Sequence, residues 1–237
     1  MKDRIKMSLL HWANYKGLAD YTVDEENPYA LPIIVRVEKD PELVPTHEEV
    51  QLAVAYAIAA FFDSDKTAPG GDWYNETHRW LEGRIRKIAR RARGTEWEKI
   101  RSLNNVYIKY GKAEVIILAP HSVSEPLPEV KKLQVSGLDL ERTCLDQPTS
   151  LKGYMTFSLN PEIEMSTGKT LAQVGHAVQL AIFASDYKTL LSWRDNNTPI
   201  RLAAWNSFDG VEVRDAGFTE IEAGSLTAKG NLTYKTI

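Results

Sequence analysis

Two long and almost entirely apolar segments constrain the fold of this 237-residue chain more than any other feature. The first follows Thr46 and runs to Phe62, and the second runs from Thr167 to about Ser185. Thr46 and Glu49 have the spacing of a capping box, so a helix is predicted to begin directly after Thr46. Because a helix that is apolar on most sides must be buried on most sides, both segments are predicted to be core helices.

Short strands are predicted on both sides of each helix. The segments rich in β-branched and apolar residues are Pro32–Val37, Val106–Lys109, Glu114–Leu118, Tyr154–Leu159, Ile200–Ala204, Val211–Arg214 and Ser225–Lys229. The order strand, long apolar helix, more helix and paired strands therefore occurs twice, at an offset of roughly 105–125 residues, which is a weak sign of duplication. Alternating strands and helices place both halves in the α/β class.

The chain is predicted to contain two α/β units. Its length of 237 residues fits one large domain or two small ones, at roughly 100–200 residues per domain. Residues 121–150 contain three prolines and no sustained period, which is typical of a connector. The connector would separate an N-terminal unit at residues 1–120, which begins irregularly, from a second unit at residues 151–237.

Composition indicates a globular protein of a reducing compartment. Apolar residues make up 43% of the chain and charged residues 26%, which excludes disordered and collagen-like chains. The single cysteine, Cys144, cannot form an internal disulfide. No apolar stretch approaches the roughly 20 residues that span a bilayer. The short apolar run Met7–Leu10 is interrupted by His11, so no signal peptide is expected and the protein is predicted to be cytoplasmic.

Basic residues are concentrated in one segment. From Arg79 to Arg101 there are nine basic and three acidic residues, so this segment has a charge of +6 and the rest of the chain −9, within a net charge of −3. Apolar residues from Leu81 to Ala92 recur at helical spacing, which predicts a basic helix beginning near Trp73. Clustered basic charge favours a polyanion partner, and a solvated helix face is the alternative. The residues predicted to bind the polyanion are Arg84, Arg86, Lys87, Arg90, Arg91 and Arg93.

A polar stripe marks the start of the second apolar helix. Lys169, Gln173 and His176 stand at i, i+4 and i+7, which places them within an arc of about 60°. Further along, the same face carries Leu180 and Phe183, so the stripe is confined to the helix N-terminus. There the helix dipole disfavours a lysine by roughly 0.3–1 kcal/mol, and a residue that breaks a local rule is a candidate functional residue.

Other interpretations of this stripe stay open. A lysine near a helix start is most often simply solvated, and a histidine on an apolar helix is more often a satisfied core residue than a catalyst. Gly168-Lys169-Thr170 also resembles part of a phosphate-binding loop. That loop needs glycine five positions before Gly168, where Ile163 stands, so nucleotide hydrolysis is not favoured.

A second candidate cluster lies near the end of the chain. Asp215 follows the predicted strand Val211–Arg214, and strand ends are the usual position of site residues in α/β folds. Taken alone, an aspartate before Ala216-Gly217 is more often a turn-former than a catalyst.

Together the two clusters resemble the type-2 peptidyl-tRNA hydrolases. That family has a helix bearing Gly-Lys, Ala-Gln and His-Ala at the spacing found here from Gly168 to Ala177. It then has Asp-Ala-Gly, a threonine four residues after the aspartate, a Pro/Ala-Gly step, and a second threonine twelve after the aspartate. Here these are Asp215-Ala216-Gly217, Thr219, Ala223-Gly224 and Thr227. The resemblance covers about residues 154–237, roughly a third of the chain.

The resemblance implies an enzyme that hydrolyses the ester between a peptide and the terminal ribose of tRNA. It also implies a three-layer α/β/α unit with a small mixed sheet, and no cofactor. The implied functional residues are Lys169, Gln173, His176, Asp215, Thr219 and Thr227. The five histidines include no His-Glu-x-x-His pair, so no catalytic metal is expected either.

Roles for these residues follow from the chemistry of ester hydrolysis, which needs a positioned water and a donor for the developing oxyanion. The hypothesis is that Asp215 orients or deprotonates the water and that Lys169 stabilises the oxyanion or a nearby phosphate. Thr219, Thr227 and Gln173 would fix the geometry, and a purely structural role for His176 is the alternative to a catalytic one.

Two departures from the family pattern matter. A further helix usually separates the second and third strands, whereas here only residues 205–210 lie between them. One wall of the substrate groove is therefore missing or supplied by the N-terminal half. That half has neither lysine nor histidine on the equivalent stripe, and Tyr110 stands near the position of Asp215. It is predicted to be an inactive partner fused in one chain, a pseudo-dimer, and an unrelated domain with a solvated basic helix is the alternative. Homodimerisation also stays open. A non-catalytic tRNA-binding or interaction protein on the same fold is the second functional candidate.

Overall fold

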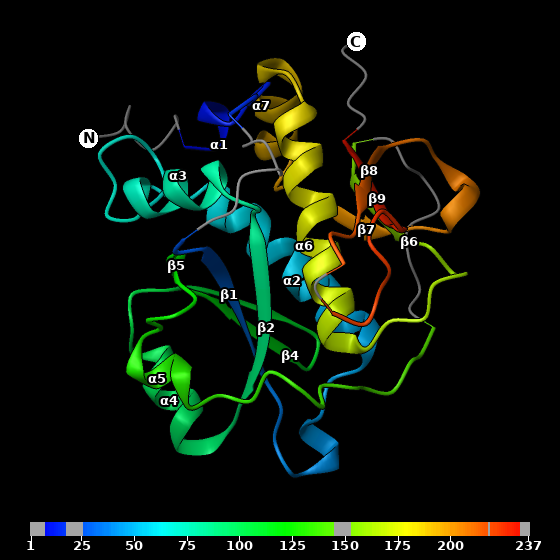
Figure 1. The fold of residues 1–237 in the computed structure, drawn as a ribbon. Coiled ribbons are helices and arrows are strands. Elements are labelled where there is room, and N and C mark those ends of the chain that lie inside the picture. Colours follow the sequence, from blue (N-terminus) through cyan, green and yellow to red (C-terminus); the bar gives the residue numbers. More distant parts are fainter. Residues whose placement is uncertain (1–7, 18–25, 145–152, 218, 233–237) are drawn as a thin grey trace.

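The computed structural model describes residues 8–17, 26–144, 153–217 and 219–232. Part of the predicted irregular start and residues 145–150 of the predicted connector lie outside these ranges. Helices alternate with strands, and the strands form two mixed sheets, which confirms the predicted α/β class. In Figure 1 two long helices lie between the sheets.

The first sheet has the strand order β2-β1-β4-β3, with the short β5 paired to β1. Its elements, with the short helices beside them, are α1 (Ser8–His11), β1 (Tyr29–Arg36), η1 (Pro41–Leu43), α2 (His47–Phe62), α3 (Tyr74–Glu82), β2 (Arg86–Ala92), α4 (Gly94–Arg101), β3 (Val106–Tyr110), β4 (Ala113–Ile117), β5 (His121–Ser122) and α5 (Pro128–Lys131). β1 is parallel to β2 and antiparallel to β4.

The second sheet has the strand order β7-β6-β9-β8. Its elements are β6 (Met155–Leu159), α6 (Thr167–Ala184), α7 (Tyr187–Asp195), β7 (Ile200–Leu202), η2 (Trp205–Ser207), β8 (Val211–Arg214) and β9 (Leu226–Leu232). β6 is parallel to β7 and antiparallel to β9, and β8 is antiparallel to β9. The two four-strand paths therefore have the same order and the same directions. The sheet of the second unit is small and mixed, as predicted, and its three-layer arrangement stays a prediction.

Local signals in the sequence placed both long helices correctly. The Thr46 side chain accepts a hydrogen bond from the Glu49 N–H, and the Glu49 carboxylate accepts one from the Thr46 N–H, so the capping box forms at the start of α2. Ser166 caps α6 in a similar way, accepting from the Lys169 N–H. These bonds satisfy N–H groups that a helix terminus otherwise leaves without partners.

The predicted basic helix begins near Trp73 as expected, but it ends at Glu82, and the prediction that it contains the basic cluster is wrong. The chain leaves α3 after Glu82, and Ile85 adopts a left-handed backbone conformation with φ of 44°, which no helix continues through. Residues Arg86–Ala92 are instead the strand β2, which pairs in parallel with β1 along its whole length. The apparent helical spacing combined residues of different elements: Leu81 belongs to α3, Ile85 lies between α3 and β2, and Ile88 and Ala92 belong to β2. Pairing with β1 satisfies backbone groups that a helix would have left unpaired on β1.

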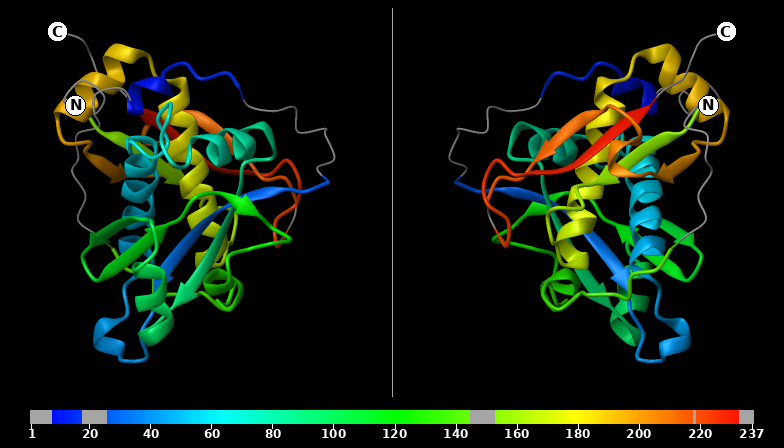
Figure 2. Two further views of the ribbon diagram at one scale, coloured as in Figure 1. Left: turned by 90° about the vertical axis from the view of Figure 1, so that its left-hand side faces the viewer. Right: turned by 90° about the vertical axis from the view of Figure 1, so that its right-hand side faces the viewer.

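The two units share one core. Helices α2 and α6 pack side by side, as both figures of the ribbon show (Figures 1 and 2), and their first residues are joined by a contact of 2.8 Å between His47 Nδ1 and Thr167 Oγ1. Each helix also packs on a strand of the other unit: α6 on β2, and α2 on β7, where Tyr56 Oη accepts from the Ile200 N–H at 3.2 Å. Buried apolar residues from both units form one continuous cluster.

Histidine burial predicts that the protein becomes less stable as the pH is lowered below about 6.5. Burial is the largest cause of a lowered pKa at every histidine of the chain, namely His11, His47, His78, His121 and His176. Their stabilising effect is therefore fully present above the ordinary pKa of 6.5 and is lost as the pH falls below it, because only the unfolded chain then binds the protons. Each can steepen the fall by up to about 1.4 kcal/mol per pH unit.

Urea unfolding at pH 7.5, 6.5 and 5.5 measures this dependence. We expect the free energy of unfolding to change little between pH 7.5 and 6.5 and to fall between pH 6.5 and 5.5, and a His78→Phe variant to show a shallower fall. An unchanged free energy of unfolding between pH 7.5 and 5.5 would contradict the expectation.

Candidate active site

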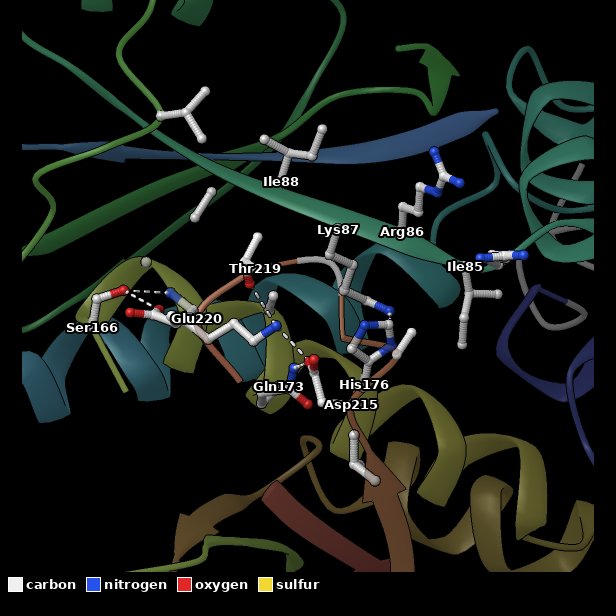
Figure 3. A pocket seen from close by; sticks show the side chains of 18 of the residues that line it. Ile85, Arg86, Lys87, Ile88, Ser166, Gln173, His176, Asp215, Thr219 and Glu220 are labelled. Carbon is white, nitrogen blue, oxygen red and sulfur yellow. Dashed lines mark hydrogen bonds and ion pairs between the residues drawn. The ribbon is translucent and has the colours of Figure 1, made fainter. Parts of the chain in front are cut away.

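The N-terminus of α6 and the end of β8 bring the predicted site residues together. Lys169 Nζ lies 2.5 Å from Asp215 Oδ2 and donates a hydrogen bond of 2.9 Å to Thr219 Oγ1. The two charged side chains are 11% and 5% exposed, so most of the pair is removed from water. The carboxylate of Asp215 also compensates for the unfavourable position of a lysine in the first turn of a helix. Figure 3 shows this cluster on one side of a pocket.

Backbone contacts fix the position of Asp215. Its N–H donates to the Ser225 carbonyl at 2.9 Å and its carbonyl accepts from the Gly224 N–H at 2.8 Å. Its Oδ1 accepts from the Gly217 N–H at 2.8 Å. Gly217 has a φ of 78°, and a Cβ there would lie 2.7 Å from the Cβ of Ala223, so this turn requires glycine.

A buried relay of hydrogen bonds supports the carboxylate from behind. Gln173 Nε2 donates to Asp215 Oδ2 at 2.9 Å, and Gln173 Oε1 accepts from Thr227 Oγ1 at 2.6 Å. Thr227 is fully buried and Gln173 is 3% exposed. The amide can therefore point only one way, with its N–H toward the carboxylate, and it orients Asp215 without needing to touch a ligand.

The loop that contains Thr219 is tied to the start of α6. Ser166 Oγ donates to Glu220 Oε1 at 2.7 Å while it caps the helix. This link could not be predicted from the sequence, because neither residue belongs to the motifs of the resembled family. It holds Thr219 beside Lys169, and Thr219 itself is exposed to the pocket.

The pocket beside this cluster has a volume of about 1250 Å³ and is lined by both units. One side consists of α6 and of the chain from Glu212 to Glu220. The other side consists of residues 84–90, Val123 and residues 135–138. The N-terminal unit, through residues 84–90, and the following residues 121–144 therefore contribute the opposite wall of the pocket. Between β7 and β8 the chain forms only the single turn η2.

The basic residues of the N-terminal unit divide between two environments. Arg84, Arg86, Lys87 and Arg90 line the pocket. Arg91 instead donates to Gln134 Oε1 at 2.9 Å and to the Gly137 carbonyl at 3.0 Å. Arg91 and Arg93 are absent from the lining of the pocket, and the prediction that they bind a polyanion stays a prediction.

Lys87 does not face water, in contrast to the expectation for the basic residues of this segment. It is only 8% exposed, and its Nζ lies 3.0 Å from Nδ1 of His176 and 2.5 Å from Oε1 of Gln179. Gln179 was missed in the sequence, although a glutamine in an otherwise apolar helix is a signal that could have identified it. Burial, followed by the nearby charges of Lys87 and Lys169, lowers the pKa of His176 well below 6.5, so its ring is neutral at pH 7.

The first unit has positions equivalent to those of this site, but residues of different chemistry occupy them. The third, seventh and tenth residues of α6 are Lys169, Gln173 and His176, and those of α2 are Glu49, Ala53 and Tyr56. Glu49 is occupied by its capping box and by the Lys112 N–H. The ring of Tyr56 stacks on Tyr110, with centroids 5.9 Å apart. No Lys–Asp pair forms among these residues of the first unit.

Nothing among the described residues suggests a metal centre or a membrane span. They contain no group of three or more metal-ligating side chains. No helix within the described ranges combines the length and apolar character that crossing a bilayer requires. Comparisons of the chain with protein-family models, curated proteins and solved structures found no match.

Proposed function

We propose that the protein hydrolyses the ester bond of peptidyl-tRNA in the cytoplasm, releasing peptide and free tRNA without a cofactor. The observation that supports this most is the Lys169–Asp215 pair, which lies at the edge of a large pocket with a threonine hydroxyl beside it. The sequence resemblance to type-2 peptidyl-tRNA hydrolases names the same residues. Their convergence from segments 46 residues apart, Lys169 to Asp215, is what that activity requires.

Lys169 has the capacity to stabilise an oxyanion. An ammonium group has three N–H donors, and contacts with Asp215 and Thr219 use two of them. The third is available to the carbonyl oxygen of an ester as it gains negative charge. Because Lys169 is largely buried, such a charge-assisted bond is stronger than it would be in water. The Thr219 hydroxyl, whose oxygen accepts from Lys169, keeps its own proton for a second donation.

Asp215 has the capacity to activate water. Its Oδ2 is occupied by Lys169 and Gln173, whereas Oδ1 accepts one bond, from the Gly217 N–H. A carboxylate oxygen can accept a further bond, so Oδ1 can hold a water for attack on the ester carbon. The water proton passes to the carboxylate and then to the ribose oxygen that leaves. Gln173 and Thr227 act by orienting Asp215.

The opposite wall of the pocket fits the tRNA part of such a substrate. Arg84, Arg86 and Arg90 line this wall, and their positive charge favours the binding of phosphate groups. Burial lowers the pKa of Arg90, whose guanidinium also donates to the Leu133 carbonyl at 3.0 Å. We therefore propose that β2 and the residues before it bind the end of tRNA nearest the ester.

We further propose that the N-terminal half is an inactive partner fused to the catalytic half. Three observations support this internal pseudo-dimer: the shared strand order, the reciprocal packing of each long helix on the other unit, and the counterpart positions in α2 that lack the chemistry. In this proposal, β2 forms the wall of the groove that an additional helix forms in the resembled family.

The second candidate is a tRNA-binding protein without turnover. The observation that favours it is the short connection between β7 and β8, where η2 stands in place of a helix. Release of labelled peptide from a purified peptidyl-tRNA separates the two. The proposed enzyme releases it far faster than buffer does, and a binding protein does not.

The pocket arginines give a separate prediction about binding. Replacing Arg86 and Arg90 with Gln is expected to weaken tRNA binding by roughly tenfold to a hundredfold and to reduce the slope of log affinity against log salt by about 1.5. Each lost phosphate contact removes one released counterion. Filter binding or fluorescence anisotropy over a range of salt concentrations measures both quantities.

Two controls accompany this measurement. Lys112→Gln changes an exposed basic residue of the β3–β4 hairpin and is expected to leave affinity and slope unchanged. Arg91→Gln tests whether contacts extend beyond the pocket. Identical affinity and slope in the Arg86→Gln/Arg90→Gln variant and the parent would remove β2 from the proposed tRNA-binding surface.

A further inference from the structure

Lys87 is a buried amine whose contacts lack a carboxylate. Its Nζ contacts His176 Nδ1 and Gln179 Oε1 and lies 4.9 Å from the centre of the Trp80 ring. Among the described residues, no acidic side chain forms an ion pair with it. Burial accordingly lowers the pKa of Lys87 well below 10.5. Such an arrangement costs stability, because a buried amine without an ionic partner is poorly solvated.

The surroundings of Lys87 are adapted to this contact at further cost. Gly175, in the middle of α6, is where the lysine stem crosses the helix, and a Cβ there would lie 2.7 Å from Lys87 Cδ. A glycine within a helix is less stable than an alanine, because its backbone loses more conformational freedom on folding. Two residues before Lys87, Ile85 lines the pocket with a φ of 44°, a strained conformation for a β-branched residue. Two unfavourable features, the buried amine and the mid-helix glycine, therefore meet at one contact beside the candidate site, and the strained Ile85 lies two residues from it.

As an ammonium group, Lys87 determines which nitrogen of His176 is protonated. An ammonium has N–H donors and no lone pair, so Nδ1 of the neutral ring accepts from it. The ring proton in that state is on Nε2. Among the described residues no side chain or backbone group forms a hydrogen bond with Nε2, and the His176 side chain lines the pocket. Figure 3 shows Lys87 and His176 directed toward each other from opposite sides of that pocket.

We propose that Lys87 is a positioning residue, supplied by the first unit, that holds His176 in the Nε2–H form so that it donates a hydrogen bond to an acceptor oxygen of the bound ester. This proposal deepens the proposed function and rests on it for the identity of the ligand. In this proposal His176 donates a hydrogen bond to the substrate. It does not act as a general base, and its role is not purely structural. It also makes the catalytic half incomplete without the N-terminal half.

Nitrogen NMR of the histidine rings tests the first part without any substrate. Protein labelled with ¹⁵N-histidine gives a two-bond ¹H–¹⁵N pattern that distinguishes the two neutral tautomers, and a His176→Gln variant identifies the signal of His176. In the parent we expect His176 as the Nε2–H tautomer alone. In Lys87→Met we expect a mixture of tautomers. A pure Nε2–H signal in Lys87→Met would overturn the proposal.

Two further variants keep this test informative. Gly175→Ala adds the Cβ that displaces the Lys87 stem, so it is expected to reproduce the mixed signal while every charge is retained. Lys109→Met removes an exposed lysine from β3 and is expected to leave the His176 signal unchanged. Lys87→Met is expected to unfold at the same temperature as the parent or higher, since an apolar side chain replaces the buried amine. If Lys87→Met fails to fold, the Gly175→Ala spectrum decides, and a pure Nε2–H signal there overturns the proposal.

A double-mutant cycle tests the second part. Lys87→Met and His176→Gln are each expected to lower kcat/KM for peptidyl-tRNA by about tenfold, and the double variant by no more than either alone, since one acts through the other. Additive losses of about a hundredfold would show that Lys87 acts independently of His176 and would overturn the proposal. If the parent protein had no hydrolase activity, the proposed function would fail while the NMR result still decided the role of Lys87.

Discussion

Asp215→Asn is expected to lower kcat for peptidyl-tRNA hydrolysis by about a thousandfold while changing KM little. The substitution keeps the size of the side chain, so the pocket stays intact. It removes the charge that pairs with Lys169 and the basic oxygen that orients the water. Removing the partner charge by Lys169→Ala is expected to cost a similar factor, because the oxyanion then loses its donor.

Matched substitutions separate this effect from a general change of charge. Asp209→Asn changes an exposed aspartate near the start of β8, and Lys188→Ala an exposed lysine of α7; neither lines the pocket. Both variants are expected to hydrolyse peptidyl-tRNA at the parental rate in steady-state assays. Unchanged circular dichroism would exclude unfolding as the cause. Parental rates in both Asp215→Asn and Lys169→Ala would exclude the assigned roles.

Gly230→Ala is expected to lower the free energy of unfolding by about 3 kcal/mol, near the upper end for an overpacked core position. Gly230 lies on the central strand β9, which pairs with β6 and β8, and β9 crosses α6 there at close range. A Cβ at this position would lie 2.2 Å from the Ala177 carbonyl oxygen. Since this obstacle belongs to the backbone of α6, it cannot rotate away, and the strand must move from the helix.

The same displacement is expected to reduce activity. Thr227 lies on β9 and Gln173 on α6, so separating the two elements stretches the 2.6 Å hydrogen bond that orients Gln173. Urea unfolding and a peptidyl-tRNA assay measure the two consequences. Gly168→Ala is the control for stability, because the nearest atom to its added Cβ, on Leu138, is 3.9 Å away. Equal stability of Gly230→Ala and the parent would contradict the described packing of β9 on α6.

Most of the fold could be predicted because its signals are local. The capping box at Thr46, the long apolar helices and the β-branched strands depend on neighbours a few residues away. The segment after Glu82 could not be predicted in this way. Its apolar residues fit a helix as well as a strand, and pairing with β1, more than 50 residues earlier in the chain, decided the outcome.

The candidate site shows the same division. The stripe of Lys169, Gln173 and His176 and the turn after Asp215 could be predicted, since each lies within one short segment. The contact of Lys87 with His176 could not, because it joins residues 89 positions apart and depends on how the two units pack. The mid-helix Gly175 was the one local sign of a close approach, and only the structure shows what approaches it.

Single-turnover release of peptide tests the proposal that the protein is an enzyme acting on peptidyl-tRNA. Excess purified protein is mixed with tRNA carrying a labelled N-acetylated dipeptide, and free peptide and tRNA with an intact 3′ end are quantified over time. We predict complete release at a rate far above that of buffer and of Asp215→Asn. A parent protein that binds this tRNA but releases peptide no faster than buffer would contradict the claim.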